Sequence, residues 1–184
     1  MKTLILYQSK CGSTKAYAED IAKATGADVY PLKGFRLKKM KDYDTIVFGG
    51  WVQGGSIQGL DKFLSEYESI KDKNVLIFST GMAFPTSDGR SLLIEQNLLD
   101  MYHIRFYMLQ GSFDIKKLRP LERILIQRSL TNLVNDPANL NQKESLEKLS
   151  SEPLVVYDHQ GIDKIVRVIN TLSLTVEVNV KDKA

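Results

Sequence analysis

The residues best suited to chemistry follow a short apolar run, Leu4–Tyr7. This segment combines three hydroxyls, a glycine, a thiol and a cation, in the order Ser9, Lys10, Cys11, Gly12, Ser13 and Thr14. Where a strand passes into a helix, free backbone N–H groups and the helix dipole together form an anion site. A phosphate monoester would fit this loop, and an ordinary capped turn accounts for the same residues equally well.

Known nucleotide motifs do not describe this loop. It lacks the GxxxxGK[ST] spacing of a P-loop, and the chain contains no GxGxxG. The sequence therefore supports neither an NTPase nor a classical dinucleotide-binding fold.

Two further segments have residues that suit the binding of a flat ligand. Gly49–Ser56 places Trp51, the only tryptophan, among four glycines, and Ser79–Thr86 offers backbone amides, small residues and the aromatic Phe84. A tryptophan on a glycine-rich loop is better placed to stack on an aromatic ring than one in a core. Both segments follow predicted strands, and open α/β sheets bind ligands at the carboxyl ends of their strands.

The elements that must position these segments alternate along the chain. Continuous apolar runs predict buried strands, and apolar residues at three-to-four spacing predict helices. Ser13 or Thr14 can cap the first helix, and Gly26 stands where it ends. This alternation predicts a parallel sheet covered on both faces. The predicted strands are 4–7, 28–30, 45–49, 75–79 and 105–109, and the helices lie near 14–25, 60–67, 91–101 and 162–172.

Two stretches depart from the alternation. Residues 114–153 are read as an insertion, with a basic amphipathic segment (116–130) followed by a polar run (135–151). The tail 174–180 alternates with period two, which predicts an extra edge strand or a contact in a homodimer.

Composition indicates one globular domain over residues 1–184. Of the 184 residues, 43% are hydrophobic and 26% charged, which excludes a disordered or collagen-like chain. The net charge of +3 is too small to argue for nucleic-acid binding. Cys11 is the only cysteine, so neither a disulfide nor a His/Cys metal site is expected. The first apolar run is too short for a signal peptide, so we expect a cytoplasmic protein.

Taken together, the three loops resemble those of the flavodoxin-like family over residues 2–113 and 154–172. The resemblance implies a doubly wound five-stranded parallel sheet of order 2-1-3-4-5, with the insertion after the fifth strand, and FMN as the cofactor. It assigns the FMN phosphate to Ser9–Thr14, one ring face to Trp51, and ring-edge contacts to the third loop. The cofactor-binding residues so implied are Ser9, Lys10, Cys11, Gly12, Ser13, Thr14, Gly50, Trp51, Val52, Gln53, Gly54, Thr80, Gly81, Met82, Ala83 and Phe84.

Charge separates two branches of that family. Electron-carrier flavodoxins are typically acidic, whereas residues 8–17, 49–60 and 79–87 contain no Asp or Glu. Coulomb's law then predicts a reduced, anionic flavin less destabilised than in an acidic carrier. The layout around the insertion resembles that of the menaquinone-dependent protoporphyrinogen IX dehydrogenase branch. It consists of Gly111-Ser112-Phe113, the basic insertion, and Tyr157-Asp158 at the start of the last helix. That resemblance implies a porphyrinogen substrate whose propionates meet the cations of the insertion, with a quinone or other redox partner.

The insertion offers cations to an anionic partner. Lys116, Lys117, Arg119 and Arg123 lie among leucines, as in a segment that meets an anionic amphipathic substrate or the inner face of a membrane. A helix that packs its leucines on the domain explains the pattern as well. No catalytic acid or base is identified. An FMN-dependent oxidoreductase is the leading hypothesis, and the alternatives are a non-enzymatic phosphate-binding module and a small soluble flavodoxin carrier.

Overall fold

The computed structural model describes residues 1–82, 86–135, 137 and 143–181. The chain divides into two compact units, one formed by Met1–Gly111 with Asp158–Ala184, the other by Ser112–Tyr157. The second unit falls where the sequence predicted an insertion at 114–153.

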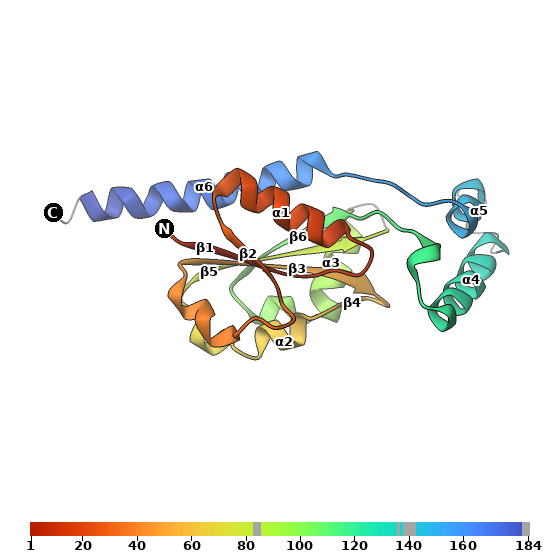
Figure 1. Cartoon of the computed structure of the whole chain (residues 1–184), viewed down its shortest axis with the longest axis horizontal. Coiled ribbons are helices and arrows are strands. Elements are labelled where there is room, and N and C mark those ends of the chain that lie inside the picture. Colours follow the sequence, from red (N-terminus) through yellow and green to blue (C-terminus); the bar gives the residue numbers. More distant parts are fainter. Residues whose placement is uncertain (83–85, 136, 138–142, 182–184) are drawn as a thin grey trace. The chain divides into compact units, whose positions relative to one another are not determined.

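The first unit is built around a sheet (Figure 1). Its strands pair in the order β2-β1-β3-β5-β6, all parallel, and the short β4 pairs antiparallel with β3. Counted without β4, this is the predicted order 2-1-3-4-5, and the fold is flavodoxin-like. The strands are β1 (Thr3–Gln8), β2 (Asp28–Pro31), β3 (Thr45–Gln53), β4 (Ser56–Ile57), β5 (Asn74–Gly81) and β6 (Ile104–Gln110).

Two helices cover one face of this sheet. Helix α1 (Ser13–Thr25) and helix α6 (His159–Lys181) bury Tyr17, Ile21 and Ile165 against the strands. Asp158 caps α6, since its carboxylate accepts a hydrogen bond of 2.8 Å from the Gly161 N–H.

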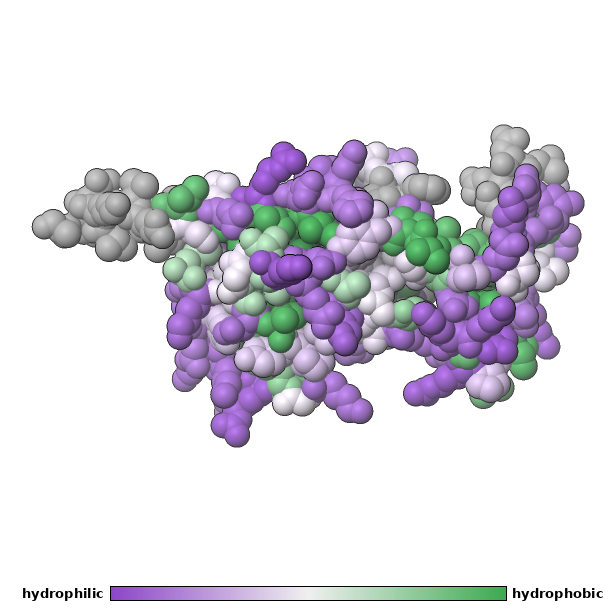
Figure 2. Space-filling view, turned by 45° about the horizontal axis from the view of Figure 1, so that its top comes forward, coloured by the Kyte–Doolittle hydropathy of each residue, from purple (hydrophilic) through white to green (hydrophobic). Residues whose placement is uncertain are grey.

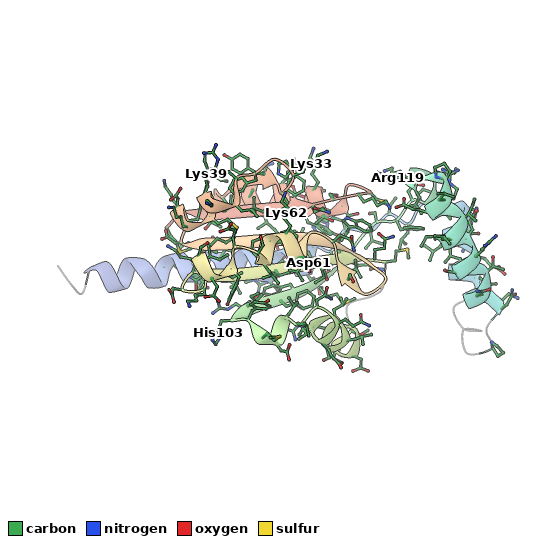
Figure 3. All side chains as sticks on the ribbon, turned by 90° about the horizontal axis from the view of Figure 1, so that it is seen from below. Lys33, Lys39, Asp61, Lys62, His103 and Arg119 are labelled. Carbon is green, nitrogen blue, oxygen red and sulfur yellow. The ribbon has the colours of Figure 1, made fainter. Side chains whose placement is uncertain are left out.

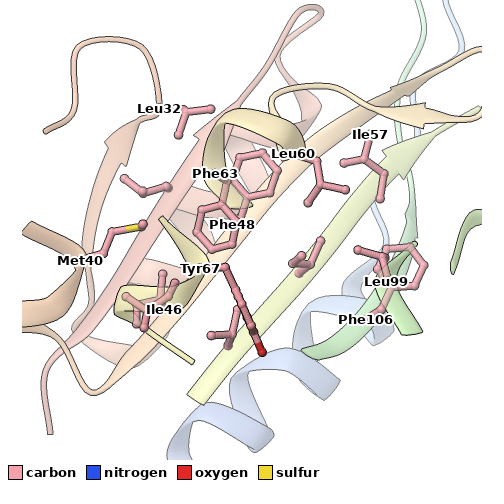
Figure 4. Packing of buried hydrophobic residues seen from close by; sticks show 14 of the residues in the cluster. Leu32, Met40, Ile46, Phe48, Ile57, Leu60, Phe63, Tyr67, Leu99 and Phe106 are labelled. Atoms are coloured by element: carbon pink, nitrogen blue, oxygen red, sulfur yellow. The ribbon is translucent and has the colours of Figure 1, made fainter. Parts of the chain in front are cut away.

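The opposite face carries shorter elements. Their apolar side chains surround the stacked rings of Phe48 and Phe63, whose centroids lie 4.9 Å apart (Figure 4). The elements on this face are α2 (Leu60–Leu64), α3 (Ser87–Gln96) and the 3₁₀ helices η1 (Leu37–Asp42), η2 (Tyr67–Ser69) and η3 (Leu99–Met101).

The second unit is helical. It contains η4 (Ile115–Lys117), α4 (Pro120–Asn135) and α5 (Lys143–Ser151), with α5 packed on α4 and η4. Backbone hydrogen bonds between Phe113 and Leu154, 2.8 and 2.7 Å long, hold its two ends together. Within the described ranges, none of the helices combines the length and apolarity needed to cross a membrane.

Three predictions of local structure are wrong. Residues 174–180 are not a strand, because α6 continues to Lys181. Ser13 and Thr14 do not cap α1, whose N-cap is Gly12 in the left-handed region at φ 105°. Gly49–Ser56 is not a loop, since β3 runs on to Gln53 and turns back into β4 through Gly54 and Gly55.

Candidate functional site

The sheet brings the three predicted segments to one edge. Strands β1, β3 and β5 are parallel neighbours, and in their register Gln8 lies beside Gly50 while Trp51 lies beside Thr80. Because the carboxyl ends of parallel strands meet at the same edge, the segment after β1, the β3–β4 hairpin and the end of β5 form one candidate site.

The first segment is a tight turn onto α1. The Ser9 hydroxyl accepts a hydrogen bond of 3.2 Å from the Gly12 N–H, and nothing lies within 4 Å of the position that a Cβ on Gly12 would take. The first turn of α1 contains no acidic residue, and Gly12 has no side chain with which to cap the helix. The helix start therefore keeps its positive end, as an anion site requires.

A cation links the first segment to the hairpin. The Lys10 ammonium lies 4.9 Å from the centre of the Trp51 ring, a cation–π contact. Trp51 is half-buried, so the indole is not packed away in the core on all sides. The sequence predicts Trp51 on a loop, whereas the structure places it inside β3, where the backbone pairing with Thr80 fixes its position.

Two buried hydroxyls link the first segment to the third. Thr14 Oγ1 and Thr80 Oγ1 lie 2.8 Å apart, and the two residues are only 1% and 4% exposed. Only one of the two can donate in this pair, so the other hydroxyl can donate to a further acceptor. Next to Thr80, the Ser79 hydroxyl is fully buried and has no hydrogen-bond partner among the described residues. Because side chains alternate along a strand, the Ser79 hydroxyl lies on the opposite face of β5 from the Thr14–Thr80 pair, so a polar ligand group at this edge could accept a hydrogen bond from that pair and not from Ser79.

Two side chains that are not among the predicted site residues hold backbone at or near the site. The Asn97 amide donates to Gly55 O (2.8 Å), and its oxygen accepts from the Ile57 N–H (2.8 Å), which fixes the β3–β4 hairpin. The Tyr17 hydroxyl donates to Gln110 O (2.6 Å) and accepts from the Asp158 N–H (2.8 Å). Asn97 could have been found from sequence, because an asparagine directly after a helix is a usable signal. Tyr17 could not, because no local pattern points to its partners.

The remaining predicted residues differ in accessibility. Cys11 and Ser13 are half-buried. Gly50 is buried, and a Cβ there would lie 2.5 Å from Ile57 Cγ2, so glycine is needed for packing. Val52 packs on the core, which makes it a structural residue. Gln53, Gly54 and Met82 are exposed, and Gly81 is half-buried. Ala83 and Phe84 lie outside the described residues.

A doubly wound parallel sheet whose main strands follow the order 2-1-3-4-5, with the candidate site at its carboxyl edge, is the arrangement of the flavodoxin-like class of α/β proteins. The family model of the flavodoxin domain matches residues 4–138, and the chain belongs to this family. No curated protein matches the chain in sequence.

The chain is also similar, at low sequence identity, to several solved flavodoxin and flavoprotein structures. Flavodoxin 2 from Bacillus cereus is 20% identical over 60% of this chain and 85% of its own, with a TM-score of 0.47. A flavodoxin from the domain Archaea is 17% identical over 80% and 99% of the two chains, with a TM-score of 0.45. A flavoprotein from Lactobacillus acidophilus, solved in complex with FMN, is 20% identical over 59% and 91%, with a TM-score of 0.42.

Proposed function

We propose that the chain binds FMN at the carboxyl edge of its sheet and acts as a flavin-dependent oxidoreductase. The observation that carries this proposal is the pair of contacts, Lys10 on Trp51 and Thr14 on Thr80, through which all three segments meet. Bound FMN supplies the redox chemistry by accepting a hydride or two electrons.

Each segment has a separate role in holding the cofactor. The turn at Ser9–Thr14 and the start of α1 bind the phosphate through backbone N–H groups. Trp51 stacks on the flavin ring once Lys10 moves off the indole, and the backbone near Thr80 and Gly81 meets the ring edge.

Titration with FMN tests this proposal. We expect stoichiometric binding with a shifted visible absorbance band, and a Kd about ten-fold or more higher in Trp51→Ala because a ring contact is lost. Tyr30→Ala is the matched control, since it removes an exposed aromatic ring on β2 and leaves FMN affinity unchanged. Failure of the chain to bind FMN would return the non-enzymatic phosphate-binding module to first place.

A finer proposal assigns the chain to quinone-linked dehydrogenation of the protoporphyrinogen IX type. Its support is the layout of the insertion before Asp158 and the absence of Asp and Glu from the three segments. We expect the FMN-loaded protein to oxidise protoporphyrinogen IX with a menaquinone analogue as acceptor. FMN-loaded protein that shows no such turnover and has a very low flavin potential would instead be a soluble carrier.

A further inference from the structure

Helix α4 turns an apolar face to solvent. Leu121, Ile124 and Leu125 are 77%, 47% and 62% exposed, although each is large and apolar. Their spacing of three and four residues places them on one side of the helix. Leu130 lies on the opposite side and is 4% exposed, so the packed face of α4 is already occupied. The first two turns of α4 therefore present apolar side chains with no partner among the described residues.

Cations surround this apolar face. Three exposed cations directly precede this face in the sequence: Lys116, Lys117 and Arg119. A fourth, Arg128, is also exposed and follows Leu121 by seven residues, or two helical turns, so it lies on the same side of α4. Residues 116–128 contain five Lys or Arg against one Glu. Figure 3 labels Arg119 at the start of α4, and Figure 2 shows hydrophobic surface among the hydrophilic surface of this unit.

Arg123 does not belong to this set of exposed cations. Its guanidinium donates a hydrogen bond of 2.9 Å to Lys116 O, and its Nε is buried. The Glu122 carboxylate accepts a hydrogen bond of 3.1 Å from the Arg119 N–H. The first contact holds η4 against α4 and the second bonds the residue that precedes α4 to its first turn, so both fix the segment of Lys116 and Arg119 at the start of the helix.

We propose that this face of α4 docks on the surface of an anionic lipid bilayer. A helix that lies in a bilayer interface sinks its apolar side chains below the headgroups while its Lys and Arg remain at the phosphates. Exposed leucines ringed by cations match that environment in both polarity and charge. An exposed helix face is convex, which suits a deformable lipid surface better than a small anionic substrate.

Sedimentation of the full chain with lipid vesicles tests the proposal. We expect binding to vesicles that contain phosphatidylglycerol, little binding to pure phosphatidylcholine, and release as salt is raised. Lys116→Gln/Lys117→Gln/Arg119→Gln should weaken binding about 100-fold, at about five-fold for each cation. Leu121→Ser/Leu125→Ser should weaken it about ten-fold or more, because apolar burial is lost.

Matched control variants distinguish binding by this face of α4 from a general attraction of the protein's positive charge to anionic lipid. Lys33→Gln/Lys38→Gln/Lys39→Gln removes the same charge from the other unit and should retain most of the binding. Leu92→Ser, at a position 53% exposed on α3, controls for the loss of an apolar side chain. Helical content from circular dichroism and FMN affinity report whether each variant folds.

Three outcomes would overturn the proposal. The first is that anionic vesicles fail to bind, or that the Lys33 triple variant loses binding as fully as the Lys116 triple variant. The second is that Leu121→Ser/Leu125→Ser dissociates a dimer, which would make the face a contact between copies. The third is that soluble protoporphyrin, and not vesicles, binds in a manner that needs Lys116, Lys117 and Arg119.

Discussion

Lys10 is the only Lys or Arg in the three segments Ser9–Thr14, Gly49–Ser56 and Ser79–Thr86. Its ammonium lies 4.9 Å from the centre of Trp51, and the segments around it contain no carboxylate. Positive charge beside a ring that becomes anionic on reduction stabilises the reduced form, and partial desolvation strengthens this interaction. This single side chain should therefore help to set the flavin potential.

Lys10→Glu tests that electrostatic role. Reversal of the charge should lower the midpoint potential of bound FMN by about 30 mV, equivalent to about 1.4 kcal/mol for a two-electron couple. Redox titration against reference dyes measures the shift. The control is Lys33→Glu, which makes the same change at an exposed position outside the three segments. Equal shifts in the two variants would assign the effect to net charge alone.

Tyr43 carries a prediction about alkaline stability. Its hydroxyl donates a hydrogen bond of 2.9 Å to Asp28, and burial together with that carboxylate raises the pKa of Tyr43 to about 12. An unfolded tyrosine ionises near pH 10 (about 10 in model peptides). Between these two values the unfolded chain has released the proton and the folded chain has not, so folding loses free energy as pH rises.

Tyr43→Phe should therefore flatten the decline in stability above about pH 10. Urea unfolding at about pH 9 and about pH 11 measures the free energy of unfolding of both proteins. Burial also raises the pKa of Tyr17 and Tyr107, so part of the decline will remain in the variant. An identical decline in wild type and variant would show that Tyr43 ionises normally in the folded protein.

Among the elements, the β3–β4 hairpin depends on a residue outside itself. Gly54 and Gly55 both have positive φ, as a two-residue hairpin turn requires, and the Asn97 side chain bonds Gly55 O in that turn and the Ile57 N–H in β4. The Asn97 amide also donates a hydrogen bond of 2.9 Å to Leu93 O, so it connects the hairpin to the end of α3. The position of Trp51 follows from this arrangement.

Asn97→Ala should loosen the hairpin without unfolding the protein. The loss leaves the Ile57 N–H and Gly55 O without their partner, at a cost of about 1–3 kcal/mol in stability. FMN affinity should fall as well, because Trp51 is held less firmly, and the visible circular dichroism of bound FMN should weaken. Asn97→Asp, which keeps one acceptor for the Ile57 N–H, should restore part of both. Unchanged FMN affinity and dichroism in Asn97→Ala would show that β3 alone positions Trp51.

Sequence predicted the sheet better than the hairpin or the tail. Continuous apolar strands such as 45–49 and 75–79 are buried on both faces, and this leaves a strong local signal. The hairpin was missed because glycines at 49 and 50 read as a loop, although they lie within β3 to make room for Phe78 and Ile57. The tail at 174–180 has strand-like alternation, but it continues a helix already anchored by Ile165 and Ile169, and this context outweighs β propensity.

The candidate site was likewise predicted from sequence in part and missed in part. Its segments Ser9–Thr14 and Thr80–Met82 were predicted because strand ends are visible in sequence, whereas Tyr17 was missed because its partners, Gln110 and Asp158, lie far along the chain. Contacts of this kind depend on the tertiary fold, and no local pattern encodes them.

At the scale of the whole molecule, Tyr17 joins the two places where the chain leaves and re-enters the first unit. Its hydroxyl bonds Gln110 O at the end of β6 and the Asp158 N–H before α6. Both backbone groups therefore lie within hydrogen-bond distance of one oxygen atom. The first unit closes on itself at this point, and the second unit, Ser112–Tyr157, is inserted there.

Replacement of residues 112–157 by a linker of about four Gly and Ser residues should therefore leave the first unit folded, since that length easily spans the gap. We expect cooperative unfolding and an FMN Kd within about three-fold of wild type, because the three ligand segments all belong to the first unit. Vesicle binding should be lost with α4. In this shortened protein Tyr17→Phe should cost about 1 kcal/mol, since the bridge between Gln110 and Asp158 is broken. A shortened protein that folds but no longer binds FMN would show that the second unit completes the cofactor site, and the proposed division between a flavin unit and a membrane-docking unit would be wrong.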